Sequence, residues 1–129
     1  MNFNFTRQLV VSILILFTSV TMAQTIPQMF HGIWEQNKVN CKQSLEINLT
    51  GDTGIIINST NINFGTIMGC KIRKVGKFDK KNVFSAEYAC TTDEKVAEDY
   101  WKIFVQTNGP DKLKLKFEDT KSNSYTRCN

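Results

Sequence analysis

The sequence predicts an all-β protein, an antiparallel up-and-down barrel or sandwich of seven to eight short strands that carries two disulfides. Two observations support this prediction. Apolar and polar residues alternate in most segments, which is typical of strands with one buried face. Turn-forming residues recur every 8–14 residues, and successive segments have the pattern of hairpins, which favours a meander.

The first 23 residues have the layout of a secretory signal peptide. Arg7 gives a positive start, Leu9–Val20 is a short apolar stretch, and Thr21-Met22-Ala23 places small residues before a cleavage site. The apolar stretch is too short to anchor the chain in a bilayer. We therefore expect a periplasmic or secreted protein whose residues 24–129 form a single domain without a membrane anchor.

Residues 44–49 alternate apolar and polar side chains and precede a turn at 50–54, which predicts the first hairpin. Facing residues of an antiparallel hairpin have position numbers with a constant sum. A sum of 104 places Leu49 opposite Ile55. Further short strands are expected at 29–36, 61–64 and 122–128.

Apolar side chains also alternate on both sides of the loop 107–111. A sum of 218 pairs Val105 with Leu113 and Trp101 with Phe117. A register shift of one residue would turn the apolar side chains of one strand toward solvent. The apolar pattern therefore excludes such a shift.

A third hairpin bears on the cysteines. A sum of 160 places Cys70 opposite Cys90 and Ile72 opposite Tyr88. Directly opposed residues lie ~4.5–5.5 Å apart, within the range of a disulfide. We therefore predict a Cys70–Cys90 bridge. The remaining pair would be Cys41 and Cys128, and the alternative pairing joins Cys41 to Cys70 and Cys90 to Cys128.

The segment 30–34 contains Gly32-Ile33-Trp34, which resembles the Gly-x-Trp that opens lipocalin and avidin-like barrels. The resemblance implies that Trp34 lies across the closed end of a barrel and that Arg127, on the last strand, packs over it. Neighbouring side chains of a regular strand point to opposite faces, so Arg127 and Cys128 cannot both point into the barrel. If Cys128 points inward, Arg127 can pack over Trp34 only where a β-bulge interrupts the alternation.

Size, export signal and cysteine layout resemble those of small exported proteins of Gram-negative bacteria, among them periplasmic lysozyme inhibitors and periplasmic immunity proteins. This resemblance implies a monomeric protein that binds and blocks a cell-wall hydrolase. The alternative is a lipocalin-like carrier of a small apolar ligand, which would need an apolar cavity of several hundred Å³, roughly. An interior filled by side chains would argue against the carrier, and the side chains expected there are Leu45, Ile47, Ile57, Ile72, Tyr88, Trp101 and Phe117.

The formal net charge of +4 is mildly basic, which makes nucleic acid an improbable partner. Basic residues gather around Gly76 and acidic residues within 91–99, so we expect one basic and one acidic rim of the barrel. The rim loops 76–82 and 107–111 are the expected contact surface. The candidate partner-binding residues there are Lys77, Asp79, Lys80, Lys81 and Asn108.

No catalytic or cofactor-binding motif is recognisable in the chain. His31 is the single histidine, and no nucleophile stands near it in a familiar spacing. The carboxylate pairs Asp93-Glu94 and Glu98-Asp99 belong to a polar loop. No two cysteines have the short spacing of zinc ligands. We therefore expect neither an enzyme, nor a cofactor, nor a metal site.

Overall fold

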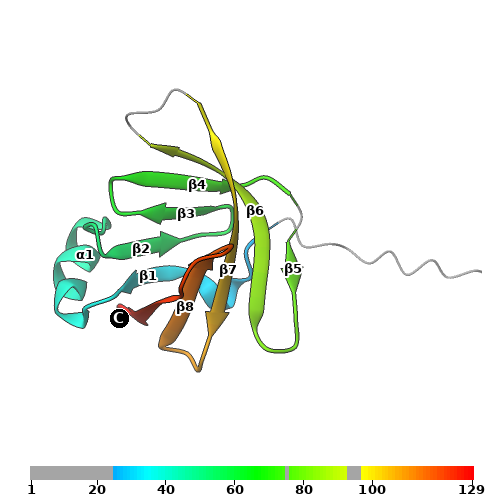
Figure 1. The fold of residues 1–129 in the computed structure, drawn as a ribbon. Helices are drawn as coiled ribbons and strands as arrows, with labels where there is room; N and C mark the ends of the chain where they lie inside the picture. The colour runs from blue at the N-terminus through cyan, green and yellow to red at the C-terminus, as the bar shows by residue number, and fades with distance from the viewer. Residues whose placement is uncertain (1–24, 75, 93–96) are drawn as a thin grey trace, which may run out of the picture.

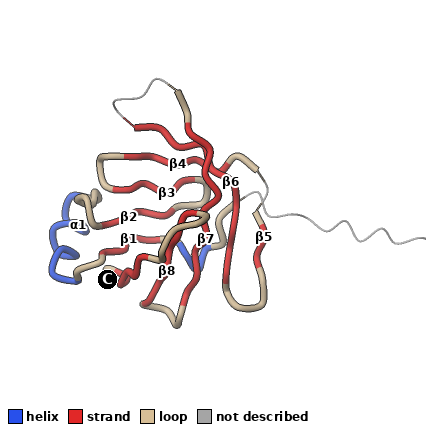
Figure 2. Tube along the Cα trace, in the orientation of Figure 1, coloured by secondary structure: helices blue, strands red, loops and turns tan. Residues whose placement is uncertain are grey.

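The computed structural model describes residues 25–74, 76–92 and 97–129, which form a β-barrel with short helical segments (Figures 1 and 2). The strands are β1 (Gly32–Glu35), β2 (Gly54–Ile57), β3 (Asn61–Phe64), β4 (Met68–Ile72), β5 (Lys77–Phe78), β6 (Val83–Thr92), β7 (Asp99–Thr107), β8 (Lys112–Phe117) and β9 (Asn123–Arg127). The helical segments are α1 (Cys41–Ile47) and the 3-10 turns η1 (Gln28–Phe30) and η2 (Lys38–Asn40). The predicted signal peptide and Asp93-Glu94 lie outside the described residues.

Eight of these strands close into an antiparallel barrel, which confirms the predicted up-and-down meander. Each barrel strand pairs with the next barrel strand along the chain, β4 with β6, and β9 pairs with β1 to close the barrel. The short strand β5 is additional to the barrel. It pairs with the beginning of β6, whereas β4 pairs with the end of β6. None of the helices in the described part of the chain has the length and apolar character needed to cross a bilayer.

Both predicted disulfides are present, and all four cysteines take part in them. Cys70 and Cys90 are directly paired across β4 and β6, with a Cα–Cα distance of 4.1 Å, so the register with a sum of 160 is confirmed. The bridge from Cys41 to Cys128 ties α1 to the residue that follows β9. Two disulfides indicate that the protein matures in an oxidising compartment.

The predicted strand at 44–49 is wrong, because most of this segment forms α1. Cys41 and Ser44 lie one helical turn apart and are both buried, whereas Leu45 and Ile47 are exposed. Asn48 ends the helix in the left-handed conformation, with φ +51°. A helix of seven residues is marginal alone, so its bridge to the chain terminus and its packing on β1 are needed to hold it. The hairpin with a sum of 104 therefore does not exist.

The hairpin of β7 and β8 forms, but its register differs from the predicted one by two positions. Val105 pairs with Leu115 and Ile103 with Phe117, a sum of 220. Strand β7 ends at Thr107 and β8 begins at Lys112, and because Thr107 pairs with Leu113 the hairpin is centred on Pro110 instead of Gly109. A shift of two residues leaves every side chain on its face of the sheet, so alternation does not distinguish the two registers.

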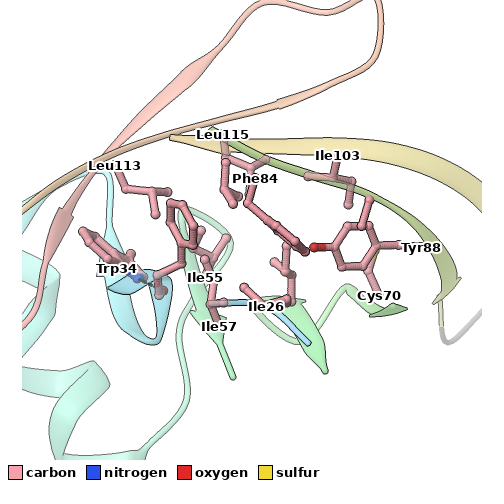
Figure 3. Close-up of a cluster of buried hydrophobic side chains, with 14 of the residues drawn as sticks. Ile26, Trp34, Ile55, Ile57, Cys70, Phe84, Tyr88, Ile103, Leu113 and Leu115 are labelled. Carbon is pink, nitrogen blue, oxygen red and sulfur yellow. Dashed lines mark hydrogen bonds between the residues drawn. The ribbon is translucent and has the colours of Figure 1, made fainter. Parts of the chain in front are cut away.

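The barrel interior is packed with side chains from every barrel strand and from the segment before β1 (Figure 3). Ile57 and Tyr88 lie there as expected, and Ile72 and Phe117 pack against this core while partly buried. The buried core consists of Ile26, Phe30, Trp34, Ile55, Ile57, Ile62, Cys70, Phe84, Ala86, Tyr88, Cys90, Ile103, Val105, Leu113, Leu115 and Tyr125.

Three side chains expected in the interior are not there. Leu45 and Ile47 belong to the exposed side of α1, with exposed fractions of 41 % and 57 %. Trp101 is 42 % exposed, and its ring contacts Phe117 edge-on from outside the buried cluster. Ile26 and Phe30 provide apolar volume instead, and Ile26 is fixed by a 2.7 Å hydrogen bond from its backbone N–H to Ser59 O.

Trp34 lies in the core at the end of the barrel where β1 begins, as the Gly-x-Trp resemblance implies. Its indole N–H donates to Phe30 O at 3.0 Å. The Arg127 guanidinium carbon lies 4.2 Å from the centroid of the Trp34 ring. The conflict over alternation disappears because Cys128 lies beyond the end of β9, so Tyr125 and Arg127 share the inner face without a bulge.

Tyr88 carries a hydroxyl that lies buried in the core without a hydrogen-bond partner in the described part of the chain (Figure 3). Burial raises the pKa of this hydroxyl far above its ordinary value, so it stays protonated at physiological pH. The hydroxyl thus loses its hydration on folding and gains no protein partner in return.

We expect Tyr88→Phe to leave the free energy of unfolding unchanged or to raise it by about 1 kcal/mol, because an unpaired buried hydroxyl costs stability. Urea unfolding followed by fluorescence measures the effect. A loss of stability of more than about 1 kcal/mol would show that an interior water or ligand binds the hydroxyl in the native protein.

Candidate functional site

The two predicted rim loops lie at the same end of the barrel and are in contact. The turn 79–82 precedes β6, and the loop 108–111 joins β7 to β8. Asn82 O accepts a 3.3 Å hydrogen bond from the Thr107 backbone, and the Gln106 side chain donates to Lys81 O at 3.3 Å. Between them is a hollow of about 420 Å³, here called the basic hollow. Its lining residues are Lys80, Lys81, Asn82, Gln106, Thr107, Asn108, Gly109 and Lys114.

The turn between β5 and β6 is held by Asp79. One carboxylate oxygen, Oδ1, accepts backbone N–H bonds from Lys81 at 2.8 Å and from Val83 at 3.2 Å. Asn82 closes the turn in the left-handed conformation, with φ +57°, which asparagine tolerates better than most residues. Asp79 therefore acts by fixing the backbone that presents Lys80 and Lys81.

The lining of the basic hollow contains three lysines and no carboxylate. The remaining lining side chains are amides and a threonine hydroxyl, all of which can donate hydrogen bonds. Such a surface attracts carboxylate or phosphate groups, and because its lysines are solvated the attraction weakens with salt.

A second hollow of about 220 Å³ continues this surface along the outer face of β6, β7 and β8. It shares Gln106 and Lys114 with the basic hollow and adds Phe104. The ammonium groups of Lys102 and Lys116 lie 5.2 Å and 5.1 Å from the Phe104 ring centroid. We call the basic hollow together with Phe104, Lys102 and Lys116 the basic face.

The structure brings only part of the predicted site together. Lys80, Lys81 and Asn108 line the basic hollow. Lys77 is exposed on β5 and is not part of the lining, and the Asp79 carboxylate is occupied in its own turn.

Five residues of the basic face were missed by sequence reasoning, namely Lys102, Phe104, Gln106, Lys114 and Lys116. The alternation KLKLKF contained a signal for two of them, since lysines between buried leucines must point outward.

The other predicted features lie elsewhere. His31 lies at the Trp34 end, where its ring Nε2 is 2.7 Å from Ile26 O, a contact that fixes the segment before β1. Glu98 and Asp99 lie where β7 begins, at the barrel end opposite the basic hollow. Within the described residues, no group of three or more His, Cys, Asp or Glu side chains is arranged to hold a metal ion.

The fold and this surface together define a disulfide-linked, up-and-down β-barrel that presents a basic face around an exposed end. Comparison with protein-family models, with curated proteins and with solved structures finds no match to the chain.

Proposed function

We propose that this chain is a periplasmic or secreted, monomeric protein that binds an acidic surface of a protein partner, as an inhibitor or immunity factor of a cell-wall hydrolase does. The observation that carries the proposal is the basic hollow. Two loops from different hairpins meet there, and the lining that they form with Lys114 of β8 contains three lysines and no carboxylate. Anionic catalytic clefts, such as those with paired carboxylates, are complementary to this charge.

The packing of the interior favours a partner on the outer surface over a ligand inside the barrel. Trp34, Phe84 and Tyr88 are each buried and occupy the interior with aromatic rings (Figure 3). Ile26 and Phe30 add volume from the segment before β1. A carrier needs apolar space in the place that these side chains fill.

The basic face has features that protein interfaces use for affinity. Phe104 is a partly exposed aromatic anchor, and two lysines lie over its ring. Lysines at the rim of such a surface speed association with an acidic partner, whereas a desolvated aromatic side chain slows dissociation.

The test is inhibition of cell-wall lysis by a panel of purified peptidoglycan hydrolases that covers glycosidases, amidases and peptidases. We expect the wild-type chain to block at least one of them, and Lys80→Glu/Lys81→Glu to weaken that inhibition at least tenfold, roughly, through slower association. The matched control is Lys38→Glu/Lys42→Glu, which makes the same charge change in exposed residues of η2 and α1, away from the basic face.

Two results would overturn the proposal. One is lysis at the uninhibited rate with every hydrolase of the panel. The other is equal inhibition by the two double variants, which would exclude the basic face as the contact surface.

A further inference from the structure

A buried carboxylate lies on the other side of the molecule, under α1. Glu35 is the last residue of β1, and its neighbour Trp34 points into the barrel, so Glu35 points to the outer face. Helix α1 lies beside β1 (Figure 1), its Ser44 contacts the Glu35 side chain, and the exposed fraction of Glu35 is 0 %. Charged side chains are rarely buried without a partner, so this glutamate requires an explanation.

The carboxylate of Glu35 has few hydrogen bonds for its degree of burial. Ser44 Oγ donates to Oε1 at 2.6 Å, and Thr53 Oγ1 donates to Oε2 at 3.4 Å. A carboxylate offers about four acceptor positions. No lysine, arginine or histidine within the described residues forms an ion pair with it.

A hollow of about 300 Å³ adjoins this carboxylate, between α1 and the loop that leads to β2. We call it the glutamate hollow. Its lining contains two carboxylates and no cationic side chain, and the apolar Ile47 and Leu49 form part of its wall. The full lining is Glu35, Asn40, Gln43, Ser44, Ile47, Leu49, Thr50, Gly51, Asp52 and Thr53.

A second unsatisfied group belongs to the same hollow. Thr50 is only 3 % exposed, and its hydroxyl oxygen has no hydrogen-bond partner in the described part of the chain. Gly54, which pairs directly with Glu35, leaves the space that both side chains use. A Cβ at position 54 would overlap the Glu35 carboxylate and the Thr50 side chain. The backbone thus brings the two groups together. Within the described residues the hydroxyl has no partner, and the carboxylate accepts only the bonds from Ser44 and Thr53.

We propose that the glutamate hollow binds an alkylammonium group, as found in a lysine side chain of a partner or in a free aliphatic amine. An ammonium has three donors and no acceptor, which complements the carboxylate and the unpaired hydroxyl. The alkyl stem would contact Ile47 and Leu49, whose side chains are exposed. To admit the ammonium, the long bond from the Thr53 hydroxyl to Glu35 must break. Thr53 is exposed, and the other contact of its hydroxyl within the described residues is a 3.5 Å bond from Asn40.

The test is an NMR titration of the wild-type protein with n-butylammonium chloride, with sodium chloride at equal ionic strength as the reference. We expect saturable shifts of the Gly51 and Gly54 amide signals with butylammonium, and none with n-butanol, which has the same alkyl stem without the charge. Absence of saturable shifts with butylammonium would overturn the proposal.

Two variants test the residues assigned. Glu35→Gln keeps the shape and the acceptor for Ser44, and we expect it to weaken butylammonium binding roughly 10- to 100-fold, the effect of losing a charged hydrogen bond. Thr50→Val removes only the unpaired hydroxyl, so we expect about fivefold weaker binding with unchanged or higher thermal stability. Unchanged affinity in both variants would show that the amine binds elsewhere.

A second titration distinguishes the two sources of the ammonium. Tighter binding of Nα-acetyl-lysine amide than of butylammonium would assign the hollow to a peptide or protein, and equal binding would assign it to a free amine. The variant Lys80→Glu/Lys81→Glu, at the basic hollow, should bind butylammonium as the wild type does. Amine binding in the glutamate hollow is therefore tested independently of whether the basic face binds a hydrolase.

Discussion

Removal of the bridge between α1 and the chain terminus, in the double variant Cys41→Ser/Cys128→Ser, is expected to lower the free energy of unfolding by about 4.6 kcal/mol. The two cysteines are 87 positions apart, so the bridge closes most of the domain into one loop. The chain-entropy model gives ~4.6 kcal/mol for such a loop and ~3.3 kcal/mol for the 20-residue separation of Cys70 and Cys90. Since small domains have about 5–15 kcal/mol in total, the loss is a large part of the stability.

The loss should be visible both globally and locally. The melting temperature should fall by roughly 15–25 °C for a domain of this size. Hydrogen exchange should rise first in α1, because a seven-residue helix depends on its tertiary contacts. The control is mass-spectrometric mapping, which must show the Cys70–Cys90 bridge intact in the variant. A change in unfolding free energy below about 1 kcal/mol would mean that the denatured chain is compact without this bridge.

Strand register made the barrel and its cysteine pairing predictable from the sequence. The apolar faces of the two strands agree when Cys70 and Cys90 are opposed, their opposition permits a disulfide, and the structure pairs them so. The β7–β8 hairpin shows the limit of the same reasoning. Its register differs by two positions, and the apolar face is identical in both alternatives.

The error at α1 has a different cause. The alternation of Leu45, Ile47 and Leu49 fits a strand, but long-range contacts decide the structure of this segment. The bridge to Cys128 and the hydrogen bond from Ser44 to Glu35 hold the helix on β1. Local patterns do not contain this information, and tertiary context overrides them.

The same error hid the glutamate hollow. Glu35 occupies an outward strand position, where a charged residue is expected to be solvated. Glu35 is buried because α1 packs on β1. With residues 44–49 predicted as a strand, no element was expected to bury this carboxylate. The basic hollow was partly predictable, because both loops were assigned to a rim. The contact of these loops with each other and with Lys114 depends on the closed barrel.

Truncation of Trp34 should be the most damaging single change in the core. Trp34 is buried, and Trp34→Ala would leave a cavity beside Leu113 and Ile55 and remove the bond to Phe30 O (Figure 3). We expect a loss of about 3–5 kcal/mol in the free energy of unfolding. Trp101→Ala is the matched control, because the same truncation at a half-exposed tryptophan should cost only about 1–2 kcal/mol.

Arg127 adds polar contacts to the apolar packing at the Trp34 end of the barrel. Its guanidinium lies over the Trp34 ring and donates to Met29 O at 2.9 Å, His31 O at 2.6 Å and Pro110 O at 2.8 Å. Arg127 therefore joins β9 to the segment before β1 and to the loop beside the basic hollow.

Arg127→Met keeps much of the stem and removes these donors, so we expect a loss of about 2 kcal/mol. A double-mutant cycle with Trp34→Ala, measured by urea unfolding, tests the contact of Arg127 with the ring. The double variant should lose roughly 1 kcal/mol less stability than the sum of the two single losses, which is the coupling of a cation with an aromatic ring. Additive losses would show that the guanidinium acts only through the three carbonyls and that the indole is not its partner. A loss of stability in Trp34→Ala no larger than in Trp101→Ala would mean that the barrel end collapses to fill the cavity, and the ring would then not determine how this end is closed.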